Sequence, residues 1–268
     1  MQDLTQRVAV ITGGGSGIGR ATCMALAQQG AYVLVTDLDA GRATAVAQEI
    51  SDAGGVADGV RCDVSSDADV AAARDAALDR FGRVDIVMNN VGVLVLGTPE
   101  AIPASAWQRL LDINVASIGR SLSVFLPGLL EQGSGHIVNT ASTAGLFAYS
   151  YERLPYSASK GAVVALSEAL ALYTRPRGVG VTVLCPGPVA TNIIEQVTAF
   201  GEPPKMHTPG LALLDPAVVG AQVCDAIRRD IFFLPTHSEV HDILVRRAQD
   251  PEGFVAAQVE SLWAQDHA

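Results

Sequence analysis

Short apolar runs rich in β-branched residues alternate along the chain with longer segments whose apolar residues recur at helical spacing. Runs of the first kind predict buried strands, and segments of the second kind predict helices. We expect strands at 7–11, 31–37, 56–62, 83–88, 136–140, 179–184 and 231–234, and helices at 18–29, 40–53, 67–80, 104–130, 156–174 and 216–229. Residues 238–264 predict one or two further helices around Asp250-Pro251. Because strand and helix alternate, this order predicts an α/β fold, a doubly wound parallel sheet with helices on both faces.

Two segments depart from this pattern. Asn114 stands in the middle of the long helical segment, where its amide competes for backbone groups, so we expect a local kink or a bound water there. The segment 192–215 has weak periodicity and several glycines and prolines. A long irregular segment of this kind in a compact domain is usually a mobile lid over a site.

Composition limits the remaining choices. The 268 residues, 49% hydrophobic and 17% charged, predict one domain over 1–268, with the lid at 192–215 and a helical C-terminal extension at 238–264. A net charge of −10 argues against nucleic acid as a partner, and no continuous apolar run approaches the roughly 18 residues that span a bilayer. Four cysteines without close spacing are typical of buried thiols in a reducing compartment. With no apolar leader, we expect a cytoplasmic protein without membrane contact.

Five glycines between 13 and 19 separate the first strand from the first helix. Such a turn lets the backbone approach a pyrophosphate, whose charge then lies on the free N–H groups of the helix N-terminus. Asp37 ends the second strand about 20 residues later, where a carboxylate can accept hydrogen bonds from an adenosine ribose. Together these features predict a dinucleotide site.

Polar residues also end the next strands. Asp63 follows the third strand, where it could contact an adenine amine, although capping of the following helix is an alternative for which Ser65, Ser66 and Asp67 are better placed. The fourth strand ends in Asn89-Asn90-Val91-Gly92. We expect the two amides to tie the central strands together, and Gly92 to let the backbone pass close to the ligand.

Tyr156 and Lys160 are four residues apart and therefore share one helical face. The histidines carry weaker signals. His136 begins a strand and is interpreted as structural, whereas His237 and His241 have the spacing of a metal pair but lack a third ligand nearby. We therefore expect no metal site.

Taken together, the ordered motifs resemble the short-chain dehydrogenase/reductase family over residues 5–235. They are Thr12-Gly13-x-x-x-Gly17-Ile18-Gly19, Asp63-Val64, Asn89-Asn90-x-Gly92, Asn114, Ser142, Tyr156-x-x-x-Lys160 and Pro186-Gly187. The resemblance implies a Rossmann-type sheet, a nicotinamide cofactor, and a homotetramer or homodimer that packs through the helices at 104–130 and 156–174. Two features depart from the family pattern: Val91 replaces the usual alanine, and the interval from Ser142 to Tyr156 is one residue longer than is most common.

The resemblance also implies a catalytic tetrad. Tyr156 would be the general acid/base, Lys160 would lower its pKa and hold the nicotinamide ribose, Ser142 would bind the substrate oxygen, and Asn114 would position a water. A free phenol titrates near 10, and reaching about 7 takes roughly 4 kcal/mol. One cation at about 5 Å supplies roughly 3 kcal/mol, so Lys160 and the positive nicotinamide ring together would suffice.

We expect NAD as the cofactor, because Asp37 would repel a 2′-phosphate and Ser16 stands where NADP-preferring relatives often carry a basic residue. Arg42 is the only nearby cation and is interpreted as a solvated helix residue. The expected cofactor-binding residues are Gly13, Ser16, Gly17, Ile18, Gly19, Asp37, Leu38, Asp63, Val64, Asn90, Gly92, Tyr156, Lys160, Pro186, Gly187, Val189 and Thr191.

The expected reaction is hydride transfer between NAD(H) and a hydrophobic secondary alcohol or ketone. Its basis is the apolar and aromatic character of the expected pocket walls: Val93, Leu94, Leu96, Leu146, Phe147, Tyr149, Tyr151, Ile193, Ile194, Val197 and Phe200, with His207 as a weaker candidate for substrate contact. A 3-oxoacyl thioester reductase is the alternative within enzymes, against which Asp37 and the acidic charge argue. An inactive dinucleotide-binding sensor is the alternative of another class, and the presence of all four tetrad residues argues against it.

Overall fold

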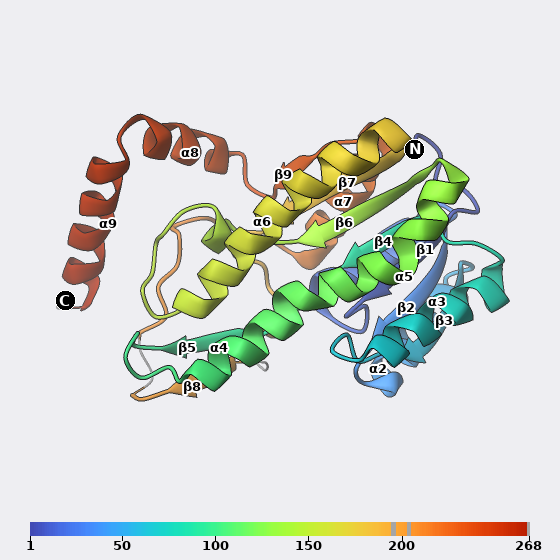
Figure 1. The fold of residues 1–268 in the computed structure, drawn as a ribbon, viewed down its shortest axis with the longest axis horizontal. Helices are drawn as coiled ribbons and strands as arrows, with labels where there is room; N and C mark the ends of the chain where they lie inside the picture. The colour runs from blue at the N-terminus through green and yellow to red at the C-terminus, as the bar shows by residue number, and fades with distance from the viewer. Residues whose placement is uncertain (194–196, 203–204, 267–268) are drawn as a thin grey trace.

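Seven parallel strands form one sheet in the order β3-β2-β1-β4-β6-β7-β9 in the computed structural model, which describes residues 1–193, 197–202 and 205–266 (Figure 1). The strand order reverses between β1 and β4, which leaves a crevice at their carboxyl ends. The predicted α/β fold with a parallel sheet is therefore confirmed. The strands are β1 (Val8–Thr12), β2 (Tyr32–Asp37), β3 (Val56–Arg61), β4 (Ile86–Asn89), β6 (Gly135–Thr140), β7 (Val179–Cys185) and β9 (Phe233–Pro235).

Helices cover both faces of the sheet, because successive strand residues point to opposite sides. Ile11 packs in a core with α1 (Gly17–Gln28), α2 (Ala40–Asp52) and α7 (Pro216–Arg229). Its neighbour Val10 packs in a second core on the other side. The helices of that second core are α3 (Asp67–Phe81), α5 (Ser117–Gln132) and α6 (Leu154–Thr174).

The long helix that contains Asn114 is interrupted, as predicted. It consists of α4 (Ala104–Leu111), a π-helical turn η1 (Asp112–Ala116) and α5. By length and composition alone, the whole run Ala104–Gln132 is long and apolar enough to cross a membrane. This was not predicted from the sequence, because the run contains no continuous apolar stretch of that length. Core helices of soluble proteins pass the same test; in this run 33% of the apolar window is buried, and Phe125 and Leu129 pack in the second core.

A second, two-stranded sheet was not predicted. β5 (Leu94–Gly97) pairs in parallel with β8 (Val197–Phe200), which lies inside the predicted lid at 192–215. The predicted lid therefore contains regular structure, and it is joined to the segment that follows β4. Strands of four residues flanked by glycine and proline are too short for their apolar pattern to be recognised in the sequence.

Element boundaries differ from the predictions in several places. β4 begins at Ile86 rather than 83, and the buried carboxylate of the preceding Asp85 forms ion pairs with Arg7 and Arg83. β9 begins two residues later than predicted, and α6 begins two residues earlier, at Leu154. The remaining elements are the short turns η2 (Thr143–Gly145) and η3 (Arg175–Arg177), and the C-terminal helices α8 (Glu239–Gln249) and α9 (Pro251–Asp266), of which α9 stands away from the large sheet (Figure 1).

Candidate active site

The glycine turn between β1 and α1 borders the crevice at the carboxyl ends of the strands. Gly13 and Gly17 have φ angles of +62° and +52°, which L side chains rarely adopt. A Cβ on Gly19 would lie 2.1 Å from the Gly13 carbonyl oxygen. The turn therefore needs glycine, and it leaves the N-terminus of α1 open to an anion. Gly19 itself packs beneath the turn and does not line the cavity.

Asp37 holds the same turn from the side of β2. Its Oδ2 accepts a hydrogen bond from the Gly15 N–H at 3.0 Å, and its Oδ1 accepts one from the Asp39 N–H at 3.1 Å. A Cβ on Gly15 would lie 2.8 Å from that Oδ2, so glycine is required there too. The carboxylate and the exposed Leu38 beside it both line the cavity.

Asp63 lines the cavity at the end of β3 and also shapes its own turn. Its Oδ1 accepts hydrogen bonds from the Ser65 N–H at 2.9 Å and from the Ser65 hydroxyl at 2.7 Å, and these bonds lower the pKa of Asp63. Ser66 caps α3 through the Asp69 N–H. The helix cap therefore belongs to Ser66, and the position of Asp63 remains compatible with ligand contact.

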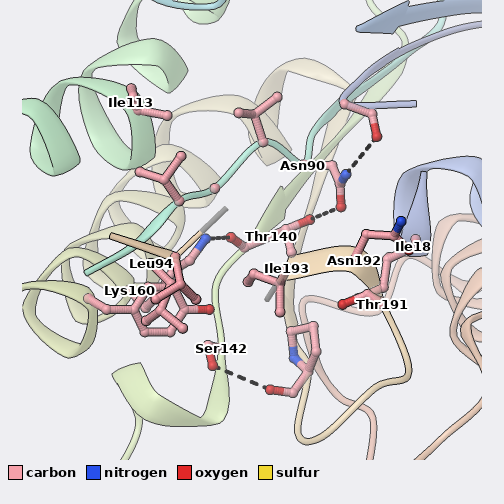
Figure 2. Close-up of a pocket in the computed structure, with 18 of the residues that line it drawn as sticks. Ile18, Asn90, Leu94, Ile113, Thr140, Ser142, Lys160, Thr191, Asn192 and Ile193 are labelled. Atoms are coloured by element: carbon pink, nitrogen blue, oxygen red, sulfur yellow. Dashed lines mark hydrogen bonds between the residues drawn. The ribbon is translucent and has the colours of Figure 1, made fainter. Parts of the chain in front are cut away.

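The two asparagines at the end of β4, Asn89 within the strand and Asn90 directly after it, tie the central strands together, as predicted. Asn89 donates to the side-chain oxygen of Asn139 at 2.8 Å. Asn90 donates to the Gly13 carbonyl at 3.3 Å and accepts from the Thr140 hydroxyl at 3.4 Å (Figure 2). Asn90 thus connects the glycine turn to the end of β6.

Ser142, Tyr156 and Lys160 meet at the end of β6. The Lys160 ammonium donates to the Thr140 carbonyl at 2.7 Å and lies 5.7 Å from the centre of the Tyr156 ring (Figure 2). Burial raises the pKa of the Tyr156 phenol to about 12, against an opposing hydrogen bond with Ser142. Burial also lowers the pKa of Lys160 to about 8. Burial therefore opposes the lowering of the phenol pKa that was expected from the sequence.

Two glycines leave the space that Lys160 occupies. A Cβ on Gly145 would lie 2.4 Å from the main-chain carbonyl carbon of Lys160, and one on Gly92 would lie 3.1 Å from its ammonium nitrogen. Gly92 was among the predicted residues, whereas Gly145 and Thr140 were not. Gly145 contributes a close approach of two backbones, and Thr140 contributes a main-chain carbonyl. Neither contribution can be recognised from the type of residue in the sequence.

Asn114 lies behind the site, and it does not line the cavity. Its Oδ1 accepts from the Val93 N–H at 2.8 Å, and its amide donates to the Val93 carbonyl at 3.1 Å and to the Ser159 hydroxyl at 3.0 Å. The side chain therefore holds the segment after β4 against α6.

These elements enclose a cavity of about 1170 Å³. This volume is large enough for a dinucleotide together with a small substrate. Apart from Gly19, all of the predicted cofactor-binding residues line it. The positive-φ glycines, the open helix N-terminus and the carboxylate of Asp37 fit a dinucleotide.

Only some of the residues predicted to contact the substrate line the cavity. We call the part of the cavity that they line its substrate end. Val93, Leu94, Tyr149, Ile193, Val197 and Phe200 line it. Leu96, Leu146 and Phe147 pack instead in a hydrophobic core, the Tyr151 hydroxyl bonds Asp266 of α9, and Ile194 lies outside the described residues. Arg153 lines the cavity as well, although sequence analysis missed it, and so does His207.

The other histidines have structural partners. The His136 ring contacts the Thr182 hydroxyl at 2.8 Å. His237 contacts the Thr236 hydroxyl and the Ala212 carbonyl, and His241 packs edge-on against Phe233. Within residues 1–193, 197–202 and 205–266, no three His, Cys, Asp or Glu side chains lie together as a metal site would require.

Comparison with known proteins gives consistent matches. Residues 7–201 match the family model described as short chain dehydrogenase. The chain is 34% identical to a cyclohexanol dehydrogenase from an Acinetobacter species, over 88% of this chain and 93% of that protein. It is 37% identical to 2-(S)-hydroxypropyl-CoM dehydrogenase 3 from Xanthobacter autotrophicus, over 78% of this chain and 82% of the relative.

Solved structures agree with these relatives. A short chain dehydrogenase/reductase from Burkholderia phymatum in complex with NAD superposes with a TM-score of 0.84 and 33% identity, over 94% of this chain and 96% of that one. A 3-ketoacyl-(acyl-carrier-protein) reductase from Brucella melitensis complexed with NADH gives 0.76 and 30%, over 87% and 97%. Together with the geometry of the cavity, these matches establish that the chain belongs to the short-chain dehydrogenase/reductase family of oxidoreductases.

Proposed function

We propose that this oxidoreductase transfers a hydride between NAD(H) and a hydrophobic secondary alcohol or ketone. The observation that carries the proposal is the convergence of Ser142, Tyr156 and Lys160 on one cavity, with the Lys160 ammonium 5.7 Å from the Tyr156 ring. A hydride can leave an alcohol carbon only if the hydroxyl proton leaves with it. The phenol of Tyr156 is the group placed to accept that proton.

Each of the three side chains has a separate task. Tyr156 exchanges a proton with the substrate oxygen, and Ser142, which lines the same cavity, holds that oxygen in place. Lys160 stabilises the ionised phenol. NAD, when bound, supplies the hydride acceptor and a positively charged ring beside the phenol.

Burial makes both positive charges necessary. Lowering the phenol pKa from about 12 to about 7 takes about 7 kcal/mol. One cation at about 5 Å supplies about 3 kcal/mol at an effective dielectric constant of 20. Lys160 alone is therefore insufficient, whereas Lys160 and the oxidised nicotinamide together come close. This difference favours proton transfer only when the oxidised cofactor is bound.

Preference for NAD over NADP rests on Asp37. Its carboxylate lines the cavity beside the glycine turn, where it can accept hydrogen bonds from ribose hydroxyls and would repel a 2′-phosphate. Arg42 lines the same region but lies 3.8 Å from the Asp39 carboxylate, so its charge is partly offset. The complexes of the two solved relatives with NAD and NADH are consistent with this assignment.

The substrate class follows from the walls of the cavity. Val93, Leu94, Val197 and Phe200 are apolar and line the same cavity as Ser142. They favour a hydrophobic secondary alcohol over a sugar or a phosphorylated substrate. Similarity to a cyclohexanol dehydrogenase makes a cyclic alcohol the first substrate to test.

The test is a panel of secondary alcohols with NAD, cyclohexanol first, in which NADH formation is followed by absorbance. We expect turnover of at least one cyclic or branched alcohol and a higher kcat/KM with NAD than with NADP. The Brucella relative raises a second candidate, so reduction of an acetoacetyl thioester with NADH is measured in parallel. Thioester reduction without alcohol oxidation would favour that reductase. NAD binding without turnover of any substrate would favour an inactive sensor.

A further inference from the structure

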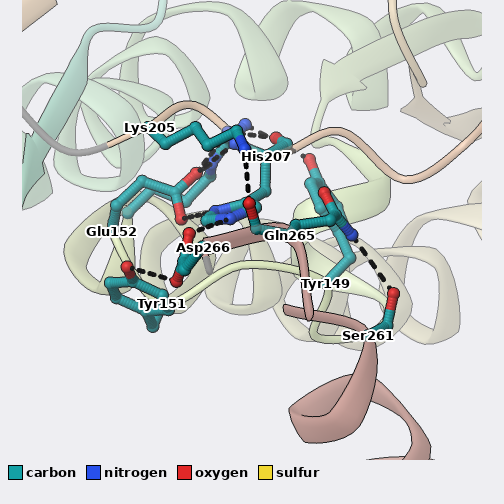
Figure 3. A network of polar contacts seen from close by, with 9 residues as sticks. Tyr149, Tyr151, Glu152, Lys205, His207, Ser261, Gln265 and Asp266 are labelled. Carbon is teal, nitrogen blue, oxygen red and sulfur yellow. Dashed lines mark hydrogen bonds and ion pairs between the residues drawn. The ribbon is translucent and has the colours of Figure 1, made fainter. Parts of the chain in front are cut away.

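The imidazole of His207 lies between two carboxylates at the substrate end of the cavity. Its Nδ1 is 3.1 Å from Glu152 Oε2, and its Nε2 is 3.0 Å from Asp266 Oδ1 (Figure 3). Glu152 is fully buried, and His207 is 2% exposed. Asp266 comes from α9, so the C-terminal helix reaches a side chain that lines the cavity.

The same cluster joins three segments that are far apart in the sequence. They are the loop 149–153 before α6, residues 205–209, which we call the wall segment, and α9. The backbone of His207 is held as firmly as its ring: its N–H donates to Glu152 Oε1 at 3.0 Å, and its carbonyl accepts from Arg153 Nη2 at 2.6 Å. Tyr151 donates to Asp266 Oδ2 at 3.0 Å, and Lys205 donates to the main chain of Gln265. Four residues of the wall segment line the cavity: Met206, His207, Thr208 and Pro209.

The chemistry of the cluster makes it sensitive to protonation. A carboxylate only accepts hydrogen bonds, and a neutral imidazole donates only one. Both ring contacts of His207 therefore form as hydrogen bonds only when the ring carries both protons. The charged or titratable groups around the ring are Glu152, Asp266, Arg153, Lys205, Tyr149 and Tyr151, the last with its ring centre 5.6 Å away.

Each carboxylate of the cluster has a cation beside it. Arg153 lies 2.7 Å from Glu152 Oε1, and the His207 ring and Lys205 both act on Asp266. Burial alone would raise the pKa of Asp266, but the hydrogen bonds from Tyr151 and His207 hold it below its usual range. Glu152 and His207 are buried while Asp266 is partly exposed, so removing Asp266 leaves the buried Nε2 of His207 without the hydrogen-bond partner shown here.

We propose that Asp266, acting through the His207 ring, positions the wall segment and thereby shapes the substrate end of the cavity. The functional part of this inference, an effect on substrate affinity, rests on the proposed alcohol dehydrogenase activity. Asp266 is a positioning residue: it is not among the residues that line the cavity, and it acts on the wall through His207. Its loss should raise KM for the alcohol and leave kcat nearly unchanged, since Tyr156 and Lys160 lie outside the cluster.

The experiment compares Asp266→Asn with Glu260→Gln by residue-resolved hydrogen exchange on the full chain. Glu260 is exposed on the same helix, and its substitution removes one negative charge outside the cluster. We expect Asp266→Asn to speed exchange of the His207 amide about ten-fold at pH 6, the effect of losing one charge-assisted hydrogen bond, and Glu260→Gln to leave it unchanged. Equal exchange in all three proteins, or equal acceleration in both variants, would overturn the proposal.

The exchange measurement needs no turnover, so absence of alcohol oxidation would refute the proposed function and leave this inference to be judged on exchange. With cyclohexanol as the probe substrate, a several-fold rise in KM at constant kcat would extend the support to function, and a fall in kcat at constant KM would contradict it.

Discussion

The Lys160 ammonium nitrogen lies 5.7 Å from the centre of the Tyr156 ring, held there by the Thr140 carbonyl 2.7 Å away. Both side chains are buried, and burial moves their pKa values apart, to about 12 for the phenol and about 8 for the amine. Lys160 is a cation below its pKa and therefore assists the phenol only at pH values under about 8 in the protein alone. This relationship makes the pH dependence of the reaction a direct measure of their coupling.

Lys160→Met should shift the pH profile of alcohol oxidation. Loss of one cation at about 5 Å removes about 3 kcal/mol of stabilisation from the phenolate, which raises the pKa of Tyr156 by about 2. The acidic limb of the kcat/KM profile, on which the rate rises with pH, should move to higher pH by that amount, with about a hundred-fold loss at pH 7 and a smaller loss at pH 9. Lys160→Arg, which keeps the charge, should retain more activity than the methionine variant. An unchanged profile in Lys160→Met would show that Lys160 does not tune the phenol.

Asp37→Ser should change cofactor preference. Without the carboxylate, a 2′-phosphate is no longer repelled and the ribose hydroxyls lose an acceptor, so the ratio of kcat/KM for NADP to that for NAD should rise about ten-fold or more. Asp52→Ser is the control, because Asp52 is an exposed carboxylate at the end of α2. If the two variants give the same ratio, Asp37 does not select the cofactor.

Asn114→Ala should destabilise the fold as well as impair turnover. It removes three hydrogen bonds, two of them to the main chain of Val93. Leaving these buried groups without partners should cost about 2–4 kcal/mol in the free energy of unfolding, measured with urea. Ser159→Ala removes one of the three contacts and should cost less. A loss under about 1 kcal/mol in Asn114→Ala would contradict the positioning role that the structure gives this side chain.

Much of this arrangement could be predicted from the sequence, because apolar periodicity and glycine spacing act locally. The seven strands of the large sheet, the interruption at Asn114 and the glycine turn before Ser16 follow from such local signals. The pairing of β5 with β8 and the burial of Arg153 depend on contacts between distant segments, and no local pattern records them. For the same reason Leu96 and Phe147, expected at the substrate, pack in a core instead.

The acid sensitivity of the fold should depend on His136. Burial lowers the pKa of this ring to about 3, whereas in the unfolded chain it is about 6.5. Asp230 lies 3.9 Å from the ring and would favour its charge, but it is half exposed and lies 3.4 Å from Arg175, so burial dominates. At neutral pH the ring is uncharged in both states. Below pH 6.5 the unfolded chain binds a proton that the folded protein does not bind until about pH 3, so stability falls as the pH falls through this window.

Urea unfolding at pH 7 and pH 5 measures this contribution. His136→Asn should be less stable at pH 7, because it loses the packing of a buried ring, but its further loss on acidification should be about 2 kcal/mol smaller than that of the unmodified protein. The comparison cancels the carboxylates that titrate in the same range. Equal losses in the two proteins would show that His136 takes up its proton in the folded state.

The most direct test of the central claim is turnover of Tyr156→Phe on the best alcohol of the panel. The variant removes only the hydroxyl of a ring that is 8% exposed, so the fold and the cofactor site should persist. We predict that NADH binding, measured by fluorescence, stays within about two-fold and that kcat falls by about a thousand-fold or more, the scale of a lost general acid/base. Turnover within about ten-fold of the unmodified protein, with NADH binding intact, would contradict the assignment of Tyr156 as the proton-transfer group.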